Sequence, residues 1–287
     1  MKDGISVIVP TYNRAELLSR TLKSLAEQTF HSSRYEVIVI DDGSTDQTRQ
    51  VVDSFRDQIN IQYHYQSDQG YRVAKARNIG IQHSTFQYML FFDSGMYGRE
   101  NLLQVHYDAL SQGKGDVLIG EALGFDAMEA NNQGSIASAF DQMDREALFE
   151  YLLADAKYHD CRRHFFESVN YDLSRVLHCW VIFWTCHASC KTQDLLAIGG
   201  FDEHYQSWGG EDIELALRLA QQHKRLNVIE APVAIHLPHE KNTAEREQSL
   251  LHNLHYTHDK HQLPQTQQLL TGHWWEIVDV CRESIAS

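Results

Sequence analysis

Two short runs of β-branched residues, each ending in a polar loop, constrain the fold more than any other part of this sequence. Residues 5–9 and 37–40 are nearly continuous in apolar character, which is typical of strands buried on both faces of a parallel sheet. Residues 15–29 between them carry apolar side chains at helical spacing, so the unit predicts a β-α-β arrangement. Ligands of such sheets bind beyond the carboxyl ends of the strands, where Tyr12 and Asp42 stand in this sequence.

The composition narrows the class of protein. A chain of 287 residues with 43% hydrophobic residues is long enough for a buried core. The formal net charge of -14 argues against broad, charge-driven binding to nucleic acid. We expect no transmembrane segment, because no run approaches the roughly 20 apolar residues that span a bilayer, and no signal peptide. The 5 cysteines show no disulfide framework, so we expect a cytoplasmic protein, either free or peripheral at the inner membrane face.

Helix and strand signals alternate through the first 120 residues and return after residue 178. The predicted strands after the first two cover residues 61–65, 88–92, 116–120, 181–184 and 233–236, and helices are predicted within residues 47–55, 70–82, 141–158 and 212–222. Asp46 is the expected N-cap of the first of these helices. Helical stretches rich in charged and aromatic residues within 121–178 indicate an insertion over one end of the sheet, and the tail from 241 onward is polar and helical in pattern.

Tyr12 and Asp42 suit a nucleotide ligand. An aromatic ring at a strand end can stack on a base, and a nearby carboxylate can accept a hydrogen bond from a base N–H or a ribose hydroxyl. The alternative is that Asp42 only opens a turn and that Tyr12 only caps the strand. The β-α-β context favours the nucleotide site.

Three cations within six residues, Arg72, Lys75 and Arg77, form a local positive site in an acidic protein. Such a site suits a pyrophosphate. The alternative is a solvated helix face, which is the usual explanation of a charge run. The small residues Ala74 and Ala76 alternate with the cations and allow a ligand to approach closely, which favours the binding site.

Two further acidic motifs follow predicted strands or precede predicted helices. Asp93, with Ser94, directly follows the strand at 88–92 and could contact a ribose or a metal, although a simple turn explains it equally well. Glu211 and Asp212 begin a helix, and a carboxylate there could deprotonate an acceptor hydroxyl. Helix capping explains one of these acids, but it does not explain the Trp-Gly-Gly sequence that precedes them.

Histidine and cysteine patterns give weaker signals. His236 and His239 follow the last predicted strand, where an imidazole could bind a metal. A further run has a regular spacing of three, which drifts around a helix, so we expect a solvated polar face. That run consists of His252, His255, His258 and His261. Cys186 and Cys190 lie near His178 and His187, but the spacing matches no standard zinc motif, and buried thiols are expected.

Taken together, these motifs resemble those of the family 2 glycosyltransferases, over most of residues 4–240. The motifs that carry the resemblance are Pro10-Thr11-Tyr12-Asn13-Arg14, Asp41-Asp42-Gly43-Ser44-Thr45-Asp46, Ala76-Arg77-Asn78-Ile79-Gly80, Gly199-Gly200-Phe201-Asp202 and Trp208-Gly209-Gly210-Glu211-Asp212. The last two are similar to those of galactosyltransferase and chondroitin-polymerase members. The resemblance implies the GT-A fold, an α/β (Rossmann-like), mixed but mainly parallel sheet flanked by helices, with a helical insertion and a C-terminal helical tail.

The resemblance also implies a function and roles for residues. It implies an inverting hexosyltransferase that moves a sugar from a UDP-sugar to an acceptor hydroxyl of a glycan, a peptide, a lipid-linked sugar or a metabolite. The implied nucleotide-binding residues are Pro10, Tyr12, Arg14, Asp42, Arg72, Arg77, Asp93 and Ser94, with Tyr12 on uracil, Asp42 on its N3–H, and Arg77 supporting that carboxylate or the diphosphate. Trp208, Gly209 and Gly210 would meet the sugars, Glu211 would bind their hydroxyls, and Asp212 would be the general base.

One position departs from the family's pattern. The second aspartate of the Asp-X-Asp metal motif is Gly95 here, and losing a charged ligand weakens metal binding. Asp93 and His236 could hold Mn²⁺ or Mg²⁺ together with diphosphate oxygens and water. Alternatively, cations such as Arg72 or Lys75 could neutralise the leaving group without a metal. A third alternative is a catalytically weak protein that binds nucleotide and serves as a partner subunit.

The sequence also suggests how the chain is organised. We expect a single glycosyltransferase domain over residues 1–240, followed by a helical extension over residues 241–287 through which copies of the chain could associate. Within the domain, residues 1–120 would bind the nucleotide-sugar, residues 121–178 would form the insertion, and residues 179–240 would bind the acceptor.

Overall fold

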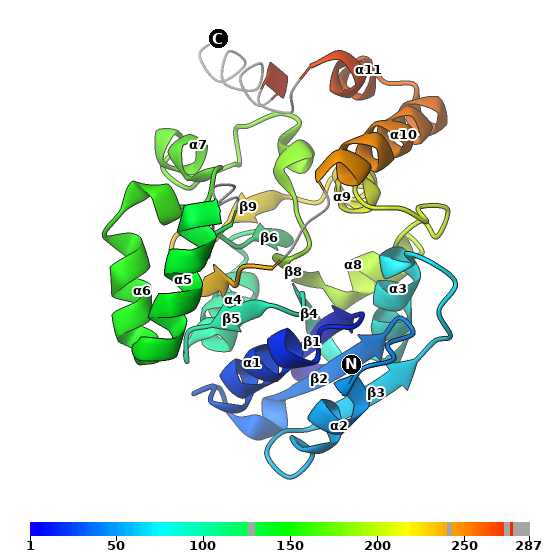
Figure 1. The fold of residues 1–287 in the computed structure, drawn as a ribbon. Helices are drawn as coiled ribbons and strands as arrows, with labels where there is room; N and C mark the ends of the chain where they lie inside the picture. The colour runs from blue at the N-terminus through cyan, green and yellow to red at the C-terminus, as the bar shows by residue number, and fades with distance from the viewer. Residues whose placement is uncertain (126–129, 240–242, 273–275, 278–287) are drawn as a thin grey trace.

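A seven-stranded sheet forms the centre of the molecule in the computed structural model, which describes residues 1–125, 130–239, 243–272 and 276–277 (Figure 1). The strands run in the order β3-β2-β1-β4-β8-β6-β9, and only β8 is antiparallel to its neighbours. Their bounds are β1 (Lys2–Thr11), β2 (Tyr35–Asp41), β3 (Ile61–Tyr65), β4 (Phe86–Phe92), β6 (Val117–Ile119), β8 (His187–Lys191) and β9 (Leu226–Val228). The mixed, mainly parallel α/β sheet predicted from the sequence is therefore confirmed.

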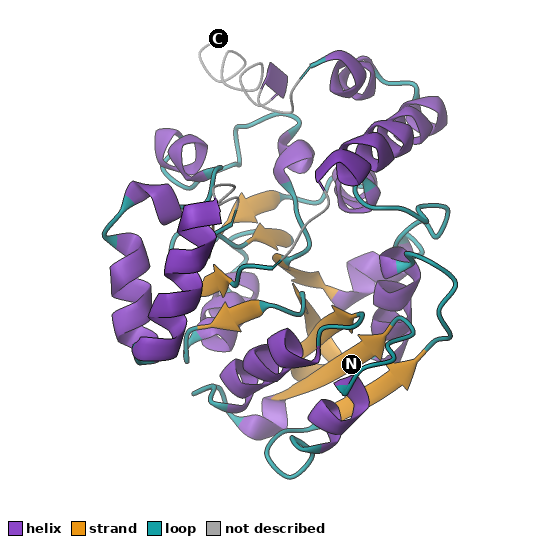
Figure 2. Ribbon diagram, in the orientation of Figure 1, coloured by secondary structure: helices purple, strands orange, loops and turns teal. Residues whose placement is uncertain are grey.

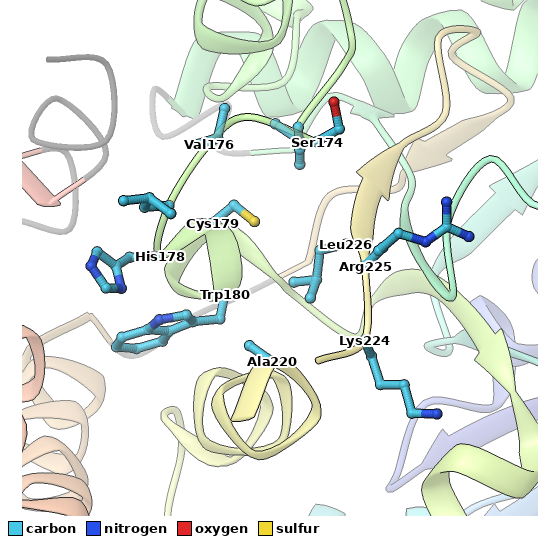
Figure 3. Close-up of a pocket in the computed structure, with 11 residues that line it drawn as sticks. Ser174, Val176, His178, Cys179, Trp180, Ala220, Lys224, Arg225 and Leu226 are labelled. Atoms are coloured by element: carbon cyan, nitrogen blue, oxygen red, sulfur yellow. The ribbon is translucent and has the colours of Figure 1, made fainter. Parts of the chain in front are cut away.

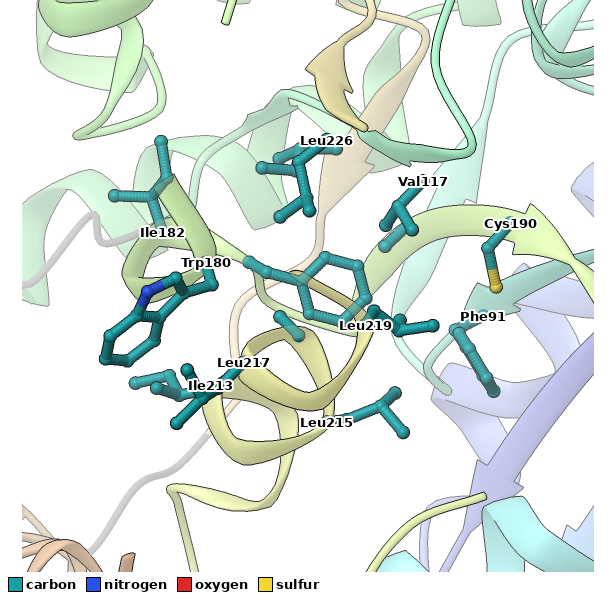
Figure 4. Close-up of a cluster of buried hydrophobic side chains, with 14 of the residues drawn as sticks. Phe91, Val117, Trp180, Ile182, Cys190, Ile213, Leu215, Leu217, Leu219 and Leu226 are labelled. Carbon is teal, nitrogen blue, oxygen red and sulfur yellow. The ribbon is translucent and has the colours of Figure 1, made fainter. Parts of the chain in front are cut away.

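Alternate side chains of the central strands point to opposite faces, and each face packs against its own helices. Val7 and Val9 pack with α1, α2 and α4, whereas Ile8 and Phe91 pack with α3, α8 and α9. Figure 4 shows part of the second cluster, in which Phe91 of the sheet lies in the same apolar cluster as the leucines of α9. The helix bounds are α1 (Ala15–Ala26), α2 (Thr48–Asp53), α3 (Val73–His83), α4 (Leu102–Ser111), α8 (Thr192–Ala197) and α9 (Glu211–Gln221).

A second, three-stranded sheet carries the helical insertion. Its strands are β5 (Met96–Gly98), β10 (Ala234–His236) and β7 (Ala122–Leu123), in that order. Tyr97, Leu123 and Ile235 of this sheet pack against Leu148 and Phe149 of the insertion. The insertion contains α5 (Ala130–Gln142), α6 (Arg145–Leu153), the 3-10 turn η2 (Ala156–Tyr158) and α7 (Arg163–Ser168), and its two longest helices lie side by side in Figure 2. β10 thus pairs on one side with β5, which follows β4, and on the other side with β7, which leads into the insertion.

Two helices follow the last strand, α10 (Thr243–His261) and α11 (Pro264–Thr271). Leu254 of α10 and Leu269 of α11 belong to the same apolar cluster as the leucines of α9. Lys260 of α10 also donates to Glu214 of α9 at 2.7 Å. The predicted helical tail therefore shares the main core of the molecule.

One predicted strand is wrong. Residues 181–184 do not form a strand, because Cys179–Ile182 is a 3-10 turn, η3, and the strand of this region is β8, which starts at His187. A short, buried apolar run cannot be distinguished from a buried helical turn by periodicity, whereas the His-Ala-Ser-Cys-Lys sequence of β8 carries no clear strand pattern. β5 and β7 were too short to give any signal. The other predicted strands lie within a few residues of observed ones.

Two expectations from composition can be compared with the structure. Within the described ranges, no helix is long and apolar enough to cross a bilayer. Cys186 and Cys190 are free thiols, and both are buried as expected. Cys281 lies outside the described residues.

Candidate active site

The two loops that follow β1 and β2 are bound to each other. β1 and β2 are paired in parallel with Thr11 opposite Asp41, so the loops leave the sheet side by side. The amide of Asn13 donates to the hydroxyl of Ser44 at 2.7 Å, and the amide of Thr45 donates to the side-chain oxygen of Asn13 at 2.8 Å. These reciprocal bonds make the two loops a single structural unit.

Asp46 fixes this unit to two helices. One carboxylate oxygen accepts from the amide of Thr48 at 3.0 Å, at the start of α2. The N-cap residue itself is Gln47, so the prediction of Asp46 as the N-cap is wrong by one position. The other oxygen accepts from the amide of Ala15 at 2.9 Å, at the start of α1. These hydrogen bonds, made largely to backbone amides, hold the pKa of Asp46 below its usual value even though burial opposes the shift.

Tyr12 and Asp42 meet at this edge of the sheet. The Tyr12 ring is 46% exposed, and its hydroxyl donates to Asp68 at 2.9 Å. Asp42 is buried and accepts from Gln66 at 2.6 Å and from the amide and guanidinium of Arg72 at 2.9 and 3.2 Å. Burial raises the pKa of Asp42, and the bonds from Arg72 and Gln66 oppose this. A carboxylate accepts about four hydrogen bonds, so one lone pair remains for a ligand.

Arg72 and Arg77 serve opposite ends of the site. Besides Asp42, Arg72 donates to the side chain of Gln69 at 2.9 Å and to the carbonyl of Ser67. Arg77 does not pair with Asp42. Its guanidinium donates to Asp93 at 3.1 and 3.2 Å and to Glu211 at 2.9 Å. The supporting role that the resemblance assigned to Arg77 at the Asp42 carboxylate is therefore filled by Arg72.

Glu211 and Asp212 occupy the first turn of α9. Gly209 and Gly210 before them have φ values of 90° and 91°, in the left-handed region that glycine adopts most readily. Burial, and then repulsion from Glu211, raise the pKa of Asp212 to about 7, while Arg77 opposes the shift. A carboxyl group with a pKa near neutral can both hold and release a proton at physiological pH, as a general base requires.

Several buried polar atoms around this carboxylate pair have no hydrogen-bond partner in the described part of the chain. They are Glu211 Oε2, Thr185 Oγ1 and Arg77 Nε. Buried polar atoms are normally bonded, so a group of unbonded ones beside an acid pair is typical of a ligand site. Thr185 carried no signal in the sequence, because a single threonine in an apolar run is common.

The loop before α9 is held by α10. The side-chain amide nitrogen of Asn253 (Nδ2) donates to three successive backbone carbonyls, those of Ser207 at 3.2 Å, Trp208 at 3.4 Å and Gly209 at 2.6 Å. Asn253 is 4% exposed. The Arg246 guanidinium lies over the Trp208 ring, 4.9 Å from its centroid. We did not identify Asn253 or Arg246 from the sequence, because both lie in a polar segment without a recognisable motif.

Asp93, Gly95 and His236 come together where the small sheet meets β4. His236 is opposite Met96 in the β10–β5 pair, and the amide of Leu237 donates to the carbonyl of Gly95 at 2.8 Å. Across the described ranges, no three His, Cys, Asp or Glu side chains are grouped to hold a metal ion. Asp93 is moreover paired with Arg77. The protein side chains present therefore do not form a metal site on their own.

The other histidine patterns do not join this site. His187 forms a buried pair with His106, with 2.8 Å between their Nε2 atoms, and burial lowers the pKa of both. Of the spaced histidines on α10, His252 and His255 are exposed as expected, whereas His261 contacts Glu214 at 3.0 Å. A separate pocket of about 200 Å³, shown in Figure 3, is lined by residues such as Trp180 and none of the predicted site residues.

Comparison with known proteins identifies related sequences. The model of the family described as glycosyl transferase family 2 matches residues 6–193, and the model described as the N-terminal domain of galactosyltransferase matches residues 166–240. The chain is 38% identical over 250 residues to validoxylamine A glucosyltransferase of Streptomyces hygroscopicus subsp. jinggangensis, covering 87% of this chain and 59% of that protein. It is 29% identical over 253 residues to chondroitin synthase of Escherichia coli, covering 85% and 36%. The chain therefore spans about three-fifths or less of these relatives.

Solved structures support the fold. The chain superimposes on Staphylococcus aureus TarS 1-349 in complex with UDP-GlcNAc with a TM-score of 0.64 and 19% identity, covering 90% of this chain and 66% of that one. It superimposes on the mannosyltransferase PcManGT of Pyrobaculum calidifontis, in complex with GDP-Man and Mn²⁺, with a TM-score of 0.63 and 18% identity, covering 100% and 74%. At this identity the likeness concerns the fold alone, and it confirms the predicted GT-A fold.

Proposed function

Because this chain belongs to glycosyltransferase family 2, we propose that it transfers a sugar from a UDP-sugar to an acceptor hydroxyl with inversion at the anomeric carbon. The observation that carries the proposal is the ion-pair chain Asp93–Arg77–Glu211. It ties the end of β4, in the nucleotide half, to the start of α9, where Asp212 has a pKa of about 7. This arrangement supports a site in which a sugar donor bound beyond β4 would lie close to the Asp212 carboxyl group.

The proposed reaction is a single displacement. Asp212 removes the proton of the acceptor hydroxyl as that oxygen attacks the anomeric carbon of the donor sugar. The bond from that carbon to the diphosphate oxygen breaks, and UDP leaves with the electron pair. Attack from the face opposite UDP inverts the configuration. Glu211, whose Oε2 has no protein partner among the described residues, is available for a sugar hydroxyl.

The remaining predicted residues divide between the two ends of the site. We propose that the exposed Tyr12 ring stacks on uracil and that the remaining lone pair of Asp42 accepts its N3–H. Asp93 and Ser94 would contact the ribose and Pro10 would line the nucleotide pocket, since the amide of Ser94 approaches the Pro10 carbonyl at 3.4 Å. Residues 208–210 would contact the sugars, and the insertion at 121–178 would select the acceptor.

We further propose that the transfer depends only weakly on a metal. Asp93 and His236 are two protein ligands at most, and Asp93 already pairs with Arg77. Gly95 has a φ of 103°, so an aspartate on this backbone would be strained. A bound Mn²⁺ or Mg²⁺ would take its other ligands from the diphosphate and from water.

The second candidate is a nucleotide-binding protein without turnover, and Gly95 is the observation that favours it. A panel of UDP-sugars, with and without Mn²⁺, scored for release of UDP, separates the two functions. Release from one donor with a chelator present supports a weakly metal-dependent transferase. Release that is abolished by the chelator and restored by Mn²⁺ contradicts weak metal dependence. Binding of UDP without release from any donor supports the second candidate.

A further inference from the structure

Of the three cations that the sequence offered for the diphosphate, Arg72 and Arg77 are already engaged by the protein, and Lys75 lies on another side of their helix. Arg72 is paired with Asp42 at the uracil end, and Arg77 is shared between Asp93 and Glu211. Lys75 is two positions from Arg77, which puts it on the opposite side of α3. If the chain uses UDP-sugars, as proposed above, the negative charge of the leaving diphosphate has to be met elsewhere.

Two other arginines lie next to predicted site residues and make no ion pair with the described part of the chain. Arg14 lies at the N-cap of α1, two residues after Tyr12, and is half-buried. Arg246 is also half-buried and lies over the Trp208 ring at 4.9 Å, on the loop that leads to Glu211. Neither guanidinium makes a salt bridge within the part of the chain that the structure describes. Arginines normally use their five donors, so these two have unused binding capacity for an anion.

The electrostatics of the pair agree with this placement. Burial and then repulsion from Arg246 lower the pKa of Arg14, while Asp93 partly offsets this shift. Burial also lowers the pKa of Arg246. Arg14 thus lies within electrostatic range of both Arg246 and Asp93, at the end of the site where β4 terminates. Two partly desolvated cations that repel each other are stabilised when an anion binds between them.

We propose that Arg14 and Arg246 form the binding site for the diphosphate of the nucleotide-sugar. Helix α10 then completes the active site by supplying Arg246. The pair supplies positive charge for the diphosphate in a chain where Gly95 replaces the second aspartate of the family's metal motif. The competing explanation is that Arg246 only packs against Trp208, as an arginine does on many exposed aromatic rings.

The test compares ligands that share uridine and differ in phosphate. Binding of uridine, UMP and UDP is measured by calorimetry, with a chelator present, for the natural protein, Arg14→Ala, Arg246→Ala and Arg246→Lys. We expect Arg246→Ala and Arg14→Ala each to weaken UDP at least tenfold, about 1.4 kcal/mol, and to leave uridine unchanged. Arg246→Lys keeps the charge but not the planar fork, so we expect an intermediate loss.

Arg56→Ala is the matched control, because it removes one positive charge from an exposed residue paired with Asp53, away from the site. It should leave all three affinities unchanged. UDP affinity that stays at the natural value in Arg246→Ala, or that falls in step with uridine affinity, overturns the proposal. A natural protein that binds uridine no more weakly than UDP also overturns it. A natural protein that binds none of the three ligands contradicts the proposed function itself, which is a different failure.

Discussion

The two ends of the site differ in how their carboxylates are bonded. We call the end around Asp42, which is proposed to bind uracil, the uracil end, and the end around Glu211 and Asp212, which is proposed to carry out the reaction, the transfer end. Asp42 accepts three hydrogen bonds from Gln66 and Arg72, and the loops around it are bound to each other. At the transfer end, Glu211 keeps a buried oxygen without a protein partner in the described chain, and burial raises the pKa of Asp212 to about 7. Asp42 is held mainly by bonds from the protein, whereas the acid pair of α9 keeps a polar atom that a substrate would bond under the proposed function.

This difference suggests a division of labour. A site whose hydrogen bonds are already formed binds its ligand with little rearrangement, and so contributes mainly to affinity. A site with unsatisfied polar atoms stabilises groups that arrive or change charge during reaction, and so contributes mainly to rate. Substitutions at the two ends should therefore change different kinetic constants.

The largest effect is expected for Asp212→Asn at the transfer end. The amide cannot accept the proton of the acceptor hydroxyl, so the transfer rate should fall by about 10³-fold, within the usual range for a general base. Binding of UDP, measured by calorimetry, should stay near the natural value. Transfer at more than a tenth of the natural rate would exclude Asp212 as the base.

The next effect is expected at the uracil end, for Tyr12→Ala. Loss of base stacking should weaken both uridine and UDP by roughly 10- to 100-fold, since stacking on an aromatic ring contributes about 1–3 kcal/mol per base. Tyr12→Phe is the control, because it removes only the exposed hydrogen bond to Asp68. If both substitutions weaken uridine equally, the hydroxyl rather than the ring would be responsible and the stacking role would be wrong.

A smaller effect on rate is expected for Asn253→Asp. The aspartate keeps the shape of the side chain but cannot donate to the carbonyls of residues 207–209, so the loop before Glu211 should shift and kcat should fall about tenfold. UDP affinity should be retained. Thr257→Val is the control for loss of stability, which is judged by Tm. Thr257 lies on the same helix as Asn253, and the substitution removes its buried hydrogen bond to Tyr205. Equal loss of kcat in both variants at equal Tm would argue against a positioning role for Asn253.

The smallest effect is a shift along the pH axis. Because the base must be deprotonated, kcat/KM should fall as the pH drops below about 7, the pKa of Asp212. Glu211 raises that pKa by repulsion, so Glu211→Gln should move this acidic limb to lower pH while also reducing activity. The position of the limb is read from pH–rate profiles of both proteins. A limb that stays in place would mean that Glu211 does not set the pKa of the base.

The sequence predicted the sheet and its loops well because each strand signal is local. It could not predict that Arg77 pairs with Glu211, because the two are separated by 134 residues and only the packed fold brings them together. It also missed β8, whose five residues mix polar and apolar types without alternation. The role of Asn253 could not be predicted for a similar reason, because nothing in a polar helical sequence indicates that one of its polar residues is buried.

The hydrogen bonds from Asn253 to the carbonyls of residues 207–209 also affect the order in which parts of the site can form while the chain is being synthesised. The strands and loops of the proposed uracil end are complete once α3 has been made, within the first third of the chain. The loop that carries Trp208 can be held only after α10 has emerged from the ribosome, more than forty residues later. A nascent chain can therefore form the loops around Asp42 before the loop at Trp208 is held, and under the proposed function the capacity to bind nucleotide would precede the capacity for turnover.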